Sequence, residues 1–325
     1  MATIKEDSEI FDLIKQLGAI RKIPQFLFCD NTYYWRWVKL KDELVLFNSQ
    51  FSDVKEIDFI LYSAGGSPDD AYRIIRTLRQ NFETVNIIIP FWAKSAATLL
   101  SLGGSKIIMA KTAEFGPIDI QVPKAKEDSP GYEYESALTD EVSLELVENR
   151  AQIRFASMYI DYYENENLHI PKTDLSKQLM EHISKFYEPL LNQINPYKLG
   201  EKKRKSDIST AYANKILTQY HDMDDKQQKT FVDYLVTACP EHGFVIDFDT
   251  LNDILPNVIQ AKDFVEDGNY EKILDQVACY FIKDTSNDKY IGFVPKIEID
   301  SAVGTKEEVD GGEIAPVTQI SPKGE

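Results

Sequence analysis

The sequence predicts an α/β fold in which a parallel β-sheet with crossover helices is followed by a helical C-terminal region. Three short apolar runs, each β-branched or aromatic and bounded by turn residues, have the pattern of buried strands at 57–62, 85–89 and 106–109. Helical patterns separate them at 69–82 and 95–102. Strand and helix alternating in this order are typical of a parallel sheet, because parallel neighbours must be joined by a crossover.

The first strand is followed by a glycine loop, residues 63–69, with the sequence SAGGSPD. Gly65 and Gly66 allow a sharp turn and a close approach to a ligand, because neither carries a Cβ. Pro68 suits the first turn of the next helix, where its missing N–H would have no partner. Such a loop can direct backbone N–H groups at an oxyanion.

The second strand is followed by residues 90–97, PFWAKSAA, which place Ser95 where a strand ends and a helix begins. The unpaired N–H groups of a helix start and the helix dipole favour negative charge there. The residues after Ser95 are small, so the helix can pack closely on the sheet. Ser95 is therefore the candidate nucleophile, although a hydroxyl needs a base to react at neutral pH.

Three motifs in this region, GGSPDDAYRI, AKSAATLLSLGGSKIIMA and FGPIDIQ, resemble the serine dehydrogenase proteinase family. That family is related to the Clp-type proteases and to signal peptide peptidase A, within the Clp/crotonase fold. The resemblance is strongest over 56–121 and weaker over 194–200 and 242–246. It implies a Clp/crotonase-like core and a serine peptidase with Ser95 as nucleophile. It also implies an oxyanion hole formed at Gly65, Gly66 and Ala96.

The chain departs from the family pattern at three positions. Lys94 precedes the nucleophile where the family often has histidine, and Ala97 stands where it often has glycine. Ile120 follows Asp119, where proline is usual. These departures keep the nucleophile but leave the identity of the general base open.

Asp119 and His242 are candidates for the rest of the catalytic group. Asp119 follows Ser95 by 24 positions, and by resemblance a histidine base lies at a comparable point in Clp-type proteases. An aspartate is a weak base for a hydroxyl, with an ordinary pKa of about 3.9; it could instead orient a base or cap a turn. His242 lies in a segment that resembles a histidine-containing family element and is the preferred histidine among four.

A lysine base is the alternative, because a buried lysine can lose its proton near neutral pH. Lys124 lies close to the position expected for a base, as do Lys111 and Lys126, although each also fits an ordinary surface lysine. Lys94 adjoins Ser95, and adjacent helix residues do not face each other. We therefore expect Lys94 to be a substrate contact or an exposed charge.

Composition narrows the classes of function. The formal net charge of −17 argues against broad binding to nucleic acid or to anionic membranes. Three widely spaced cysteines form neither a disulfide framework nor a zinc cluster, which favours a reducing, cytoplasmic location. The sequence shows no signal-peptide core and no apolar run long enough for a membrane span. It also lacks the glycine fingerprints of dinucleotide and phosphate sites, so no cofactor and no metal are expected.

We divide the chain into five regions. An N-terminal helix and strands (1–50) are expected to pack on a catalytic core (51–137). A helical region (138–275) completes or caps this core. A terminal β-hairpin (276–299) and a disordered acidic tail (300–325) complete the chain.

Within these regions the patterns predict individual elements. A helix is expected at 7–21 and strands at 25–28, 33–38 and 43–47, with Trp35 and Trp37 on one strand face. Residues 122–135 read as a mobile loop, either a lid beside the site or a solvated connector. Helices follow at 139–163, where Leu146, Ile153 and Ile160 recur near helical spacing, and at 173–192, before a break at Asn195–Pro196. Further helices are expected at 207–221, 224–237 and 247–255, and hairpin strands at 278–282 and 290–294.

Three functions are compatible with these patterns. The first is a serine peptidase that cleaves a peptide or protein substrate through an acyl-enzyme. The second is a non-catalytic Clp-fold scaffold or protein-binding module. The third is a crotonase-type acyl-CoA enzyme, for which the only basic cluster is 201–205, a run that also fits a solvated helix start or loop. Related folds assemble as rings or stacked trimers, so a homo-oligomer is expected by analogy.

Overall fold

The structure is a computed structural model. It describes residues 4–5, 8–118, 121–125, 130, 132–136, 139–165, 167, 169–239, 243–283 and 288–296. The predicted tail (300–325) lies outside the described residues.

A six-stranded sheet forms the centre of the molecule, in the order β10, β1, β2, β3, β5, β9. All neighbours are parallel except the edge strand β10, which is antiparallel to β1. The three strands predicted from the apolar runs, β2, β3 and β5, are adjacent and confirmed. The strands span Gln25–Cys29 (β1), Glu56–Tyr62 (β2), Thr84–Ile89 (β3), Lys106–Met109 (β5), Val258–Gln260 (β9) and Tyr290–Val294 (β10).

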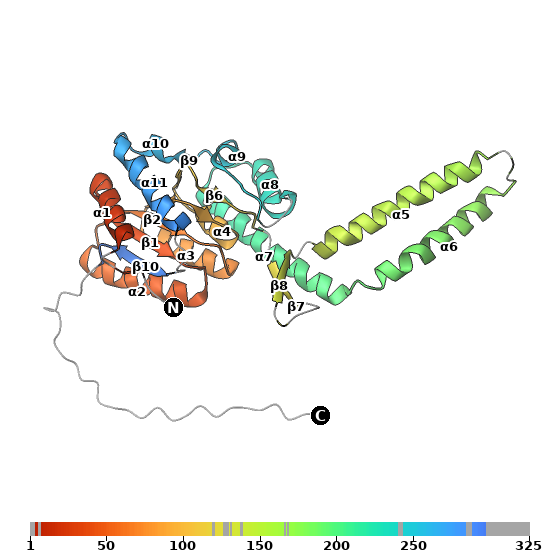
Figure 1. The fold of residues 1–325 in the computed structure, drawn as a ribbon, viewed down its shortest axis with the longest axis horizontal. Helices are drawn as coiled ribbons and strands as arrows, with labels where there is room; N and C mark the ends of the chain where they lie inside the picture. Colours follow the sequence, from red (N-terminus) through yellow and green to blue (C-terminus); the bar gives the residue numbers. More distant parts are fainter. Residues whose placement is uncertain are drawn as a thin grey trace, which may run out of the picture.

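Helices cover both faces of this sheet (Figure 1). One face carries α1 (Glu9–Arg21), α10 (Ala261–Phe264) and α11 (Gly268–Lys283); Arg21 of α1 bonds to Asp58 of β2 there. The other face carries α2 (Tyr34–Gln50), α3 (Pro68–Asn81), α4 (Ala96–Ser101) and α7 (Pro196–Tyr220). On that face Phe47 of α2 stacks on Phe293 of β10 at 4.2 Å between ring centroids. The parallel α/β fold class predicted from the sequence is thus confirmed.

The predicted strands at 33–38 and 43–47 are wrong, because this segment is the helix α2. Trp37, Leu40, Leu44 and Phe47 recur at helical spacing and turn toward the core, where the last three are buried. Trp35 is 72% exposed, whereas Trp37 donates its indole N–H to Thr77 Oγ1 at 3.0 Å. The two tryptophans therefore do not share one face. The high aromatic content of the segment suggested strands, but packing on β10 and α3 selects the helix.

Two further predictions fail. Residues 278–282 belong to the helix α11, so no terminal hairpin forms; strand 290–294 exists but pairs with β1. Residues 122–135 are largely not a loop, because β7 (Gln121–Ala125) and β8 (Tyr132–Ser136) form an antiparallel hairpin. Residues 126–129 and 131, between the two strands, lie outside the described residues.

The helical C-terminal region is confirmed. Helices α5 (Thr139–Tyr163) and α6 (Lys172–Leu191) form a long antiparallel pair, the helical arm, which projects from the α/β body (Figure 1). α7 begins at the predicted break and runs without interruption through the basic cluster, in which Lys202 is buried. The remaining elements are α8 (Asp225–Asp233), a π-helix (Tyr234–Ala238) and α9 (Phe248–Asn252). None of the helices in the described part of the chain has the length and apolar character to span a membrane.

His221 joins α7 to the helix that follows Ser95. Its Nε2 lies 2.5 Å from the carbonyl oxygen of Leu102, at the end of α4. Burial lowers the pKa of His221, and the positive charge of nearby Arg79 lowers it further. The hydrogen bond to Leu102 raises the pKa but does not cancel these effects. The ring is therefore neutral in the folded protein at pH values where an unfolded histidine already binds a proton.

This difference predicts that stability falls as the pH is lowered. Below about 6.5, the ordinary histidine pKa, the unfolded state binds a proton that the folded state resists, until the pH reaches the lowered folded pKa. The loss should stay below about 1.4 kcal/mol per pH unit, because the ring is only partly buried and solvent screens it. Urea denaturation of His221→Gln between pH 7.5 and 5.5 should show a flatter pH profile than the wild type. His182→Gln, at an exposed position of α6, is the control; a profile unchanged by His221→Gln would contradict the assignment.

Candidate active site

The two loops singled out in the sequence lie in contact. A Cβ built on Gly65 would lie 2.8 Å from the carbonyl oxygen of Lys94, 2.8 Å from Ser95 Cβ and 3.2 Å from the Ala96 nitrogen. No side chain fits between these loops. Gly65 therefore lets its backbone approach Ser95 closely, and its φ of 108° suits glycine alone.

Backbone pairing outside the main sheet fixes the position of both loops. Ser63 and Ala93 form a parallel bridge, with Ser63 N–H donating to Trp92 O and Lys94 N–H to Ser63 O, both at 3.0 Å. On its other side the glycine loop pairs with Thr32, which donates to Gly65 O and accepts from Ser67 N–H, both at 2.8 Å. The positions of Gly66 and Ser95 are thus set by hydrogen bonds across three segments that are distant in sequence.

Ser95 has an unusual backbone conformation. It precedes α4 with φ 53° and ψ −121°, a region that non-glycine residues seldom adopt. Such strain persists only where the surroundings impose it, and it gathers at functional sites. The Ser95 side chain is half-buried, and its hydroxyl has no hydrogen-bond partner among the described residues.

Two backbone N–H groups of these loops, Gly66 N–H and Ala96 N–H, have no hydrogen-bond partner among the described residues. Gly65 N–H, by contrast, already donates to Ser63 Oγ at 3.1 Å. Of the three residues expected at the oxyanion hole, Gly66 and Ala96 therefore keep a free donor, and Gly65 contributes by its lack of a side chain.

Lys94 is not an exposed charge. Its ammonium lies 2.8 Å from Glu114 Oε1 and donates to Phe115 O at 3.1 Å, and its side chain is only 13% exposed. Its aliphatic stem packs against Gly116, where a Cβ would come within 2.7 Å of Lys94 Cδ. The expectation of an exposed charge is wrong, since Lys94 pairs with the strand β6 (Glu114–Phe115) beside the Ser95 loop, whereas a substrate contact stays a prediction.

Thr98 and Ile246 are residues that the motif analysis did not assign to the site. The buried Thr98 hydroxyl lies 2.7 Å from Ala93 O and 2.8 Å from Gly116 O, so it ties α4 to the Gly116 motif. Ile246 exchanges two backbone hydrogen bonds with Phe115, at 2.9 and 3.0 Å. Thr98 sits within the quoted motif, but nothing in the sequence indicates the pairing of Ile246.

The structure describes only two of the five candidate bases, Lys111 and Lys124. Asp119, Lys126 and His242 lie outside the described residues. The backbone of Lys124 belongs to β7, opposite Glu133 of β8. Lys111 lies in an exposed turn. Ile118, which precedes Asp119, and Ile246, four positions after His242, are buried in the same core cluster as Phe115.

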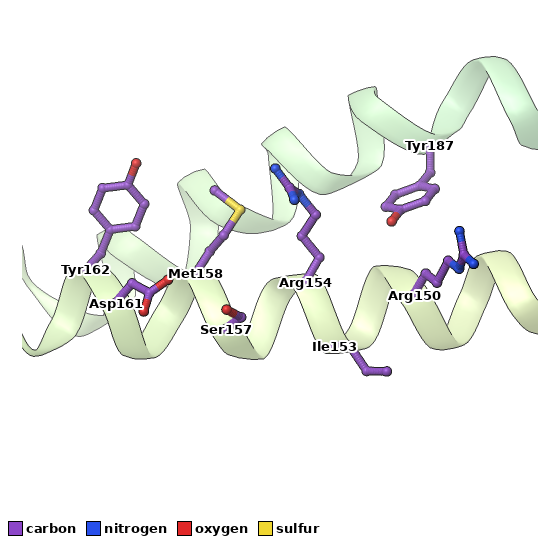
Figure 2. A pocket seen from close by; sticks show the side chains of 8 residues that line it. All are labelled: Arg150, Ile153, Arg154, Ser157, Met158, Asp161, Tyr162 and Tyr187. Atoms are coloured by element: carbon purple, nitrogen blue, oxygen red, sulfur yellow. The ribbon is translucent and has the colours of Figure 1, made fainter.

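No group of metal-ligating side chains occurs within the described ranges. A groove of about 620 Å³ lies on the helical arm, between α5 and α6, and not at Ser95. Figure 2 shows its lining: Arg150, Ile153, Arg154, Ser157, Met158, Asp161, Tyr162 and Tyr187.

Comparisons with known proteins point to the same segment. Residues 33–142 match the family described as ClpP-like SDH-type serine proteinases. Two uncharacterised proteins of Methanocaldococcus jannaschii are 37% identical over 68 residues and 35% identical over 66 residues. These matches cover 21% and 20% of this chain, and the chain spans only about a quarter of each relative, 24% and 23%.

Two solved structures are similar at lower identity. A serine-to-alanine mutant of the 1510-N membrane-bound stomatin-specific protease is 11% identical with a TM-score of 0.41, over 74% of this chain and 78% of that one. An asparagine-to-aspartate mutant of ClpP1 from Listeria monocytogenes is 18% identical with a TM-score of 0.27, over 32% of this chain and 58% of that one. The family match contains both loops and Ser95. Over residues 33–142, the chain is similar to the ClpP-like SDH-type serine proteinases.

Proposed function

We propose that this protein is a Clp-like serine peptidase that cleaves peptide bonds through an acyl-enzyme on Ser95. The observation that carries the proposal is the contact between the two loops. The glycine loop touches the strained Ser95 through Gly65, and the Gly66 and Ala96 N–H groups of these loops have no partner among the described residues, which supports an oxyanion hole there. The match of this same segment to a serine proteinase family supports it.

In this mechanism the Ser95 hydroxyl attacks the carbonyl carbon of the substrate and gives its proton to a general base. The carbonyl oxygen becomes negative and accepts hydrogen bonds from Gly66 and Ala96 N–H, which are fixed before the reaction begins. The C–N bond then breaks, the amine leaves with the proton from the base, and water hydrolyses the ester. We propose that the general base is one of three residues, Asp119, His242 or Lys124. If the base is His242 or Lys124, Asp119 can orient it.

The proposal extends to the organisation of the whole chain. Residues 51–137 form the catalytic core and 138–275 complete or cap it, and the substrate is a peptide or protein. None of the three cysteines, all within the described residues, forms a disulfide, which supports a reducing compartment such as the cytoplasm. Assembly as a homo-oligomer is part of the proposal.

A non-catalytic protein-binding scaffold is the second candidate. Two observations favour it: the Ser95 hydroxyl has no partner among the described side chains, and the adjacent Lys94 is held by Glu114 and Phe115. A scaffold would keep the fold and the two loops but would lack the base that makes Ser95 reactive.

Labelling with a fluorophosphonate probe tests the proposal. The wild type should be labelled, and peptide mass spectrometry should find the probe on Ser95, because only an activated hydroxyl reacts with it. Ser95→Ala should not be labelled. Ser101→Ala is the matched control: it removes a hydroxyl of the same helix, one bonded to Ala97 O, and should leave labelling intact. Equal labelling of the wild type and Ser95→Ala would exclude Ser95. Absence of labelling, together with no turnover of unfolded proteins, would favour the scaffold.

A further inference from the structure

The two donors of the proposed oxyanion hole belong to loops that lead into different helices. Gly66 lies two residues before Pro68, where α3 begins, and Ala96 is the first residue of α4. The position of one donor relative to the other therefore depends on how α3 and α4 are held together. A third helix, α7, contacts both of them.

The contact between α7 and α3 lies at the end of α3 that follows the glycine loop. Tyr212 of α7 donates its hydroxyl hydrogen to Asp69 Oδ1 at 2.7 Å, and its ring stacks on Tyr72 with 4.7 Å between ring centroids. The hydrogen bond to Asp69, together with burial, raises the pKa of the Tyr212 hydroxyl, so it stays a donor at neutral pH. Asp69 is the second residue of α3 and follows Gly66 by three positions. Tyr212 thus restrains the helical turn that leads out of the glycine loop.

The two residues between the glycine pair and Asp69 have little conformational freedom. Ser67 N–H donates to Thr32 O at 2.8 Å, and Ser67 Oγ accepts from Asp70 N–H at 3.3 Å. The ring of Pro68 fixes its φ. A shift of Asp69 is therefore passed on to the glycine loop, because the linking residues cannot absorb it.

The contact between α7 and α4 lies further along α7. A Cβ built on Gly103, two residues after α4 ends, would collide with Ile75 of α3 and come within 3.5 Å of Ile216 Cγ2 of α7. The three helices meet there without room for a side chain. Ile216 is four residues from Tyr212 and shares its helix face. With the bond from His221 to Leu102 at the end of α7, one helix holds the elements behind both donors.

We propose that Tyr212 is a positioning residue of the peptidase site, which sets the position of Gly66 N–H relative to Ala96 N–H through its hydrogen bond to Asp69. This role rests on the proposed function, because an oxyanion hole is needed only if Ser95 attacks a carbonyl group. Two donors stabilise one developing negative oxygen only when both point at it. A displacement of about 1 Å is enough to weaken such an arrangement. Tyr212 should therefore affect the chemical step and leave binding unchanged.

The kinetics of fluorophosphonate labelling test the proposal. Tyr212→Phe removes only the hydroxyl and keeps the ring that stacks on Tyr72. The labelling rate at saturating probe should fall about tenfold, less than the loss of about 10²–10³-fold that follows removal of a whole oxyanion donor. The probe concentration that gives half of this rate should not change, because Tyr212 acts through Asp69. A saturating rate unchanged by Tyr212→Phe would overturn the proposal.

Tyr220→Phe is the matched control for the loss of a hydroxyl. Tyr220 lies on the same helix, and its hydroxyl makes no hydrogen bond to the described residues. Its ring lies beside the Arg79 guanidinium, 4.7 Å from ring centroid to Cζ, and phenylalanine keeps that contact. This variant should be labelled at the wild-type rate. An equal fall in Tyr220→Phe and Tyr212→Phe would show a general effect on α7 and reject the specific role of Tyr212.

Substitutions of Asp69 show whether the hydrogen bond carries the effect. Asp69→Asn keeps an oxygen acceptor and should be labelled within about twofold of the wild-type rate. Asp69→Ala should be slowed as much as Tyr212→Phe. The double variant Tyr212→Phe with Asp69→Ala should be no slower than the slower single variant, because both changes remove the same interaction. Losses that multiply in the double variant would contradict the assignment.

Hydrogen exchange separates this proposal from the peptidase function on which it rests, because it does not require a reactive Ser95. Peptides that cover residues 63–70 should exchange faster in Tyr212→Phe than in the wild type, whereas those that cover β3 should not change. If the wild type is not labelled but exchange in 63–70 increases, the peptidase function fails and the positioning of the glycine loop by Tyr212 stands. Equal exchange of 63–70 in the two proteins would overturn that positioning.

Discussion

Replacing Gly65 with alanine is expected to lower the free energy of unfolding by about 3 kcal/mol or more and to abolish probe labelling of Ser95. Two costs combine. The new Cβ would lie 2.8 Å from Lys94 O and from Ser95 Cβ, and the backbone would have to keep φ at 108°. Relief of the clash requires the two loops to separate. Separation moves the glycine loop, which carries the proposed oxyanion donor Gly66, away from Ser95, so stability and reactivity should be lost together.

Gly200→Ala is the matched control for this glycine substitution. Gly200 lies inside α7, and a Cβ there meets no atom within 4 Å. Alanine should therefore stabilise the protein slightly, by up to about 1 kcal/mol, through its higher helix propensity. Urea denaturation and probe labelling of both variants provide the measurement. A Gly65→Ala protein with wild-type stability and labelling would show that the loops do not make the close contact described.

Arg21→Ala is expected to lower the free energy of unfolding by about 3–5 kcal/mol, because it leaves a buried carboxylate without its cation. Asp58 is fully buried on a central strand, and Arg21 Nε lies 2.9 Å from its Oδ2. Arg21 also bonds to Glu56 at 2.9 Å and lies 4.3 Å above the Phe264 ring. Gln25 and Asn86 each donate to Asp58, but neither supplies a positive charge.

Two further variants separate the effect of the uncompensated Asp58 charge from the other effects of Arg21→Ala. Lys15→Ala breaks an exposed ion pair with Asp12 and should cost less than about 1 kcal/mol. Adding Asp58→Asn to Arg21→Ala should restore part of the loss, because the uncompensated charge is then gone. Chemical denaturation at pH 7 gives the comparison. If Arg21→Ala and Lys15→Ala had equal effects, the ion pair on the sheet would not be the stabilising feature.

Local patterns were sufficient for the α/β core. The runs that became β2, β3 and β5 are apolar on both sides because helices cover both faces of a parallel sheet, and such runs are visible in sequence. The failure at α2 has a physical reason. Tyr34 to Phe47 is rich in aromatic residues with strand propensity, but contacts with Phe293 and Thr77 decide its state, and these partners are far away in the chain. The same reason applies to α11.

In the candidate site, too, some features have a local sequence signature and others do not. Ser95, Gly66 and Ala96 were predicted from motifs, because a helix start and a glycine turn have local signatures. The hydrogen bond that occupies Gly65 N–H depends on the loop conformation, and the pairing of Lys94 with Glu114 depends on the meeting of β4 (Trp92–Ala93) with β6. Side-chain partners of this kind have no sequence signal.

By itself, therefore, the sequence determined the parallel core, the position of Ser95 at a helix start and the helical content of the arm, because each depends on residues adjacent in the chain. Only the tertiary structure decided that Gly65 touches Ser95, that Thr32 and Ile246 hold the surrounding strands, and that Leu146, Ile153 and Ile160 stay exposed. These features arise from contacts between segments separated by tens of residues or more, and local periodicity carries no information about which segments meet.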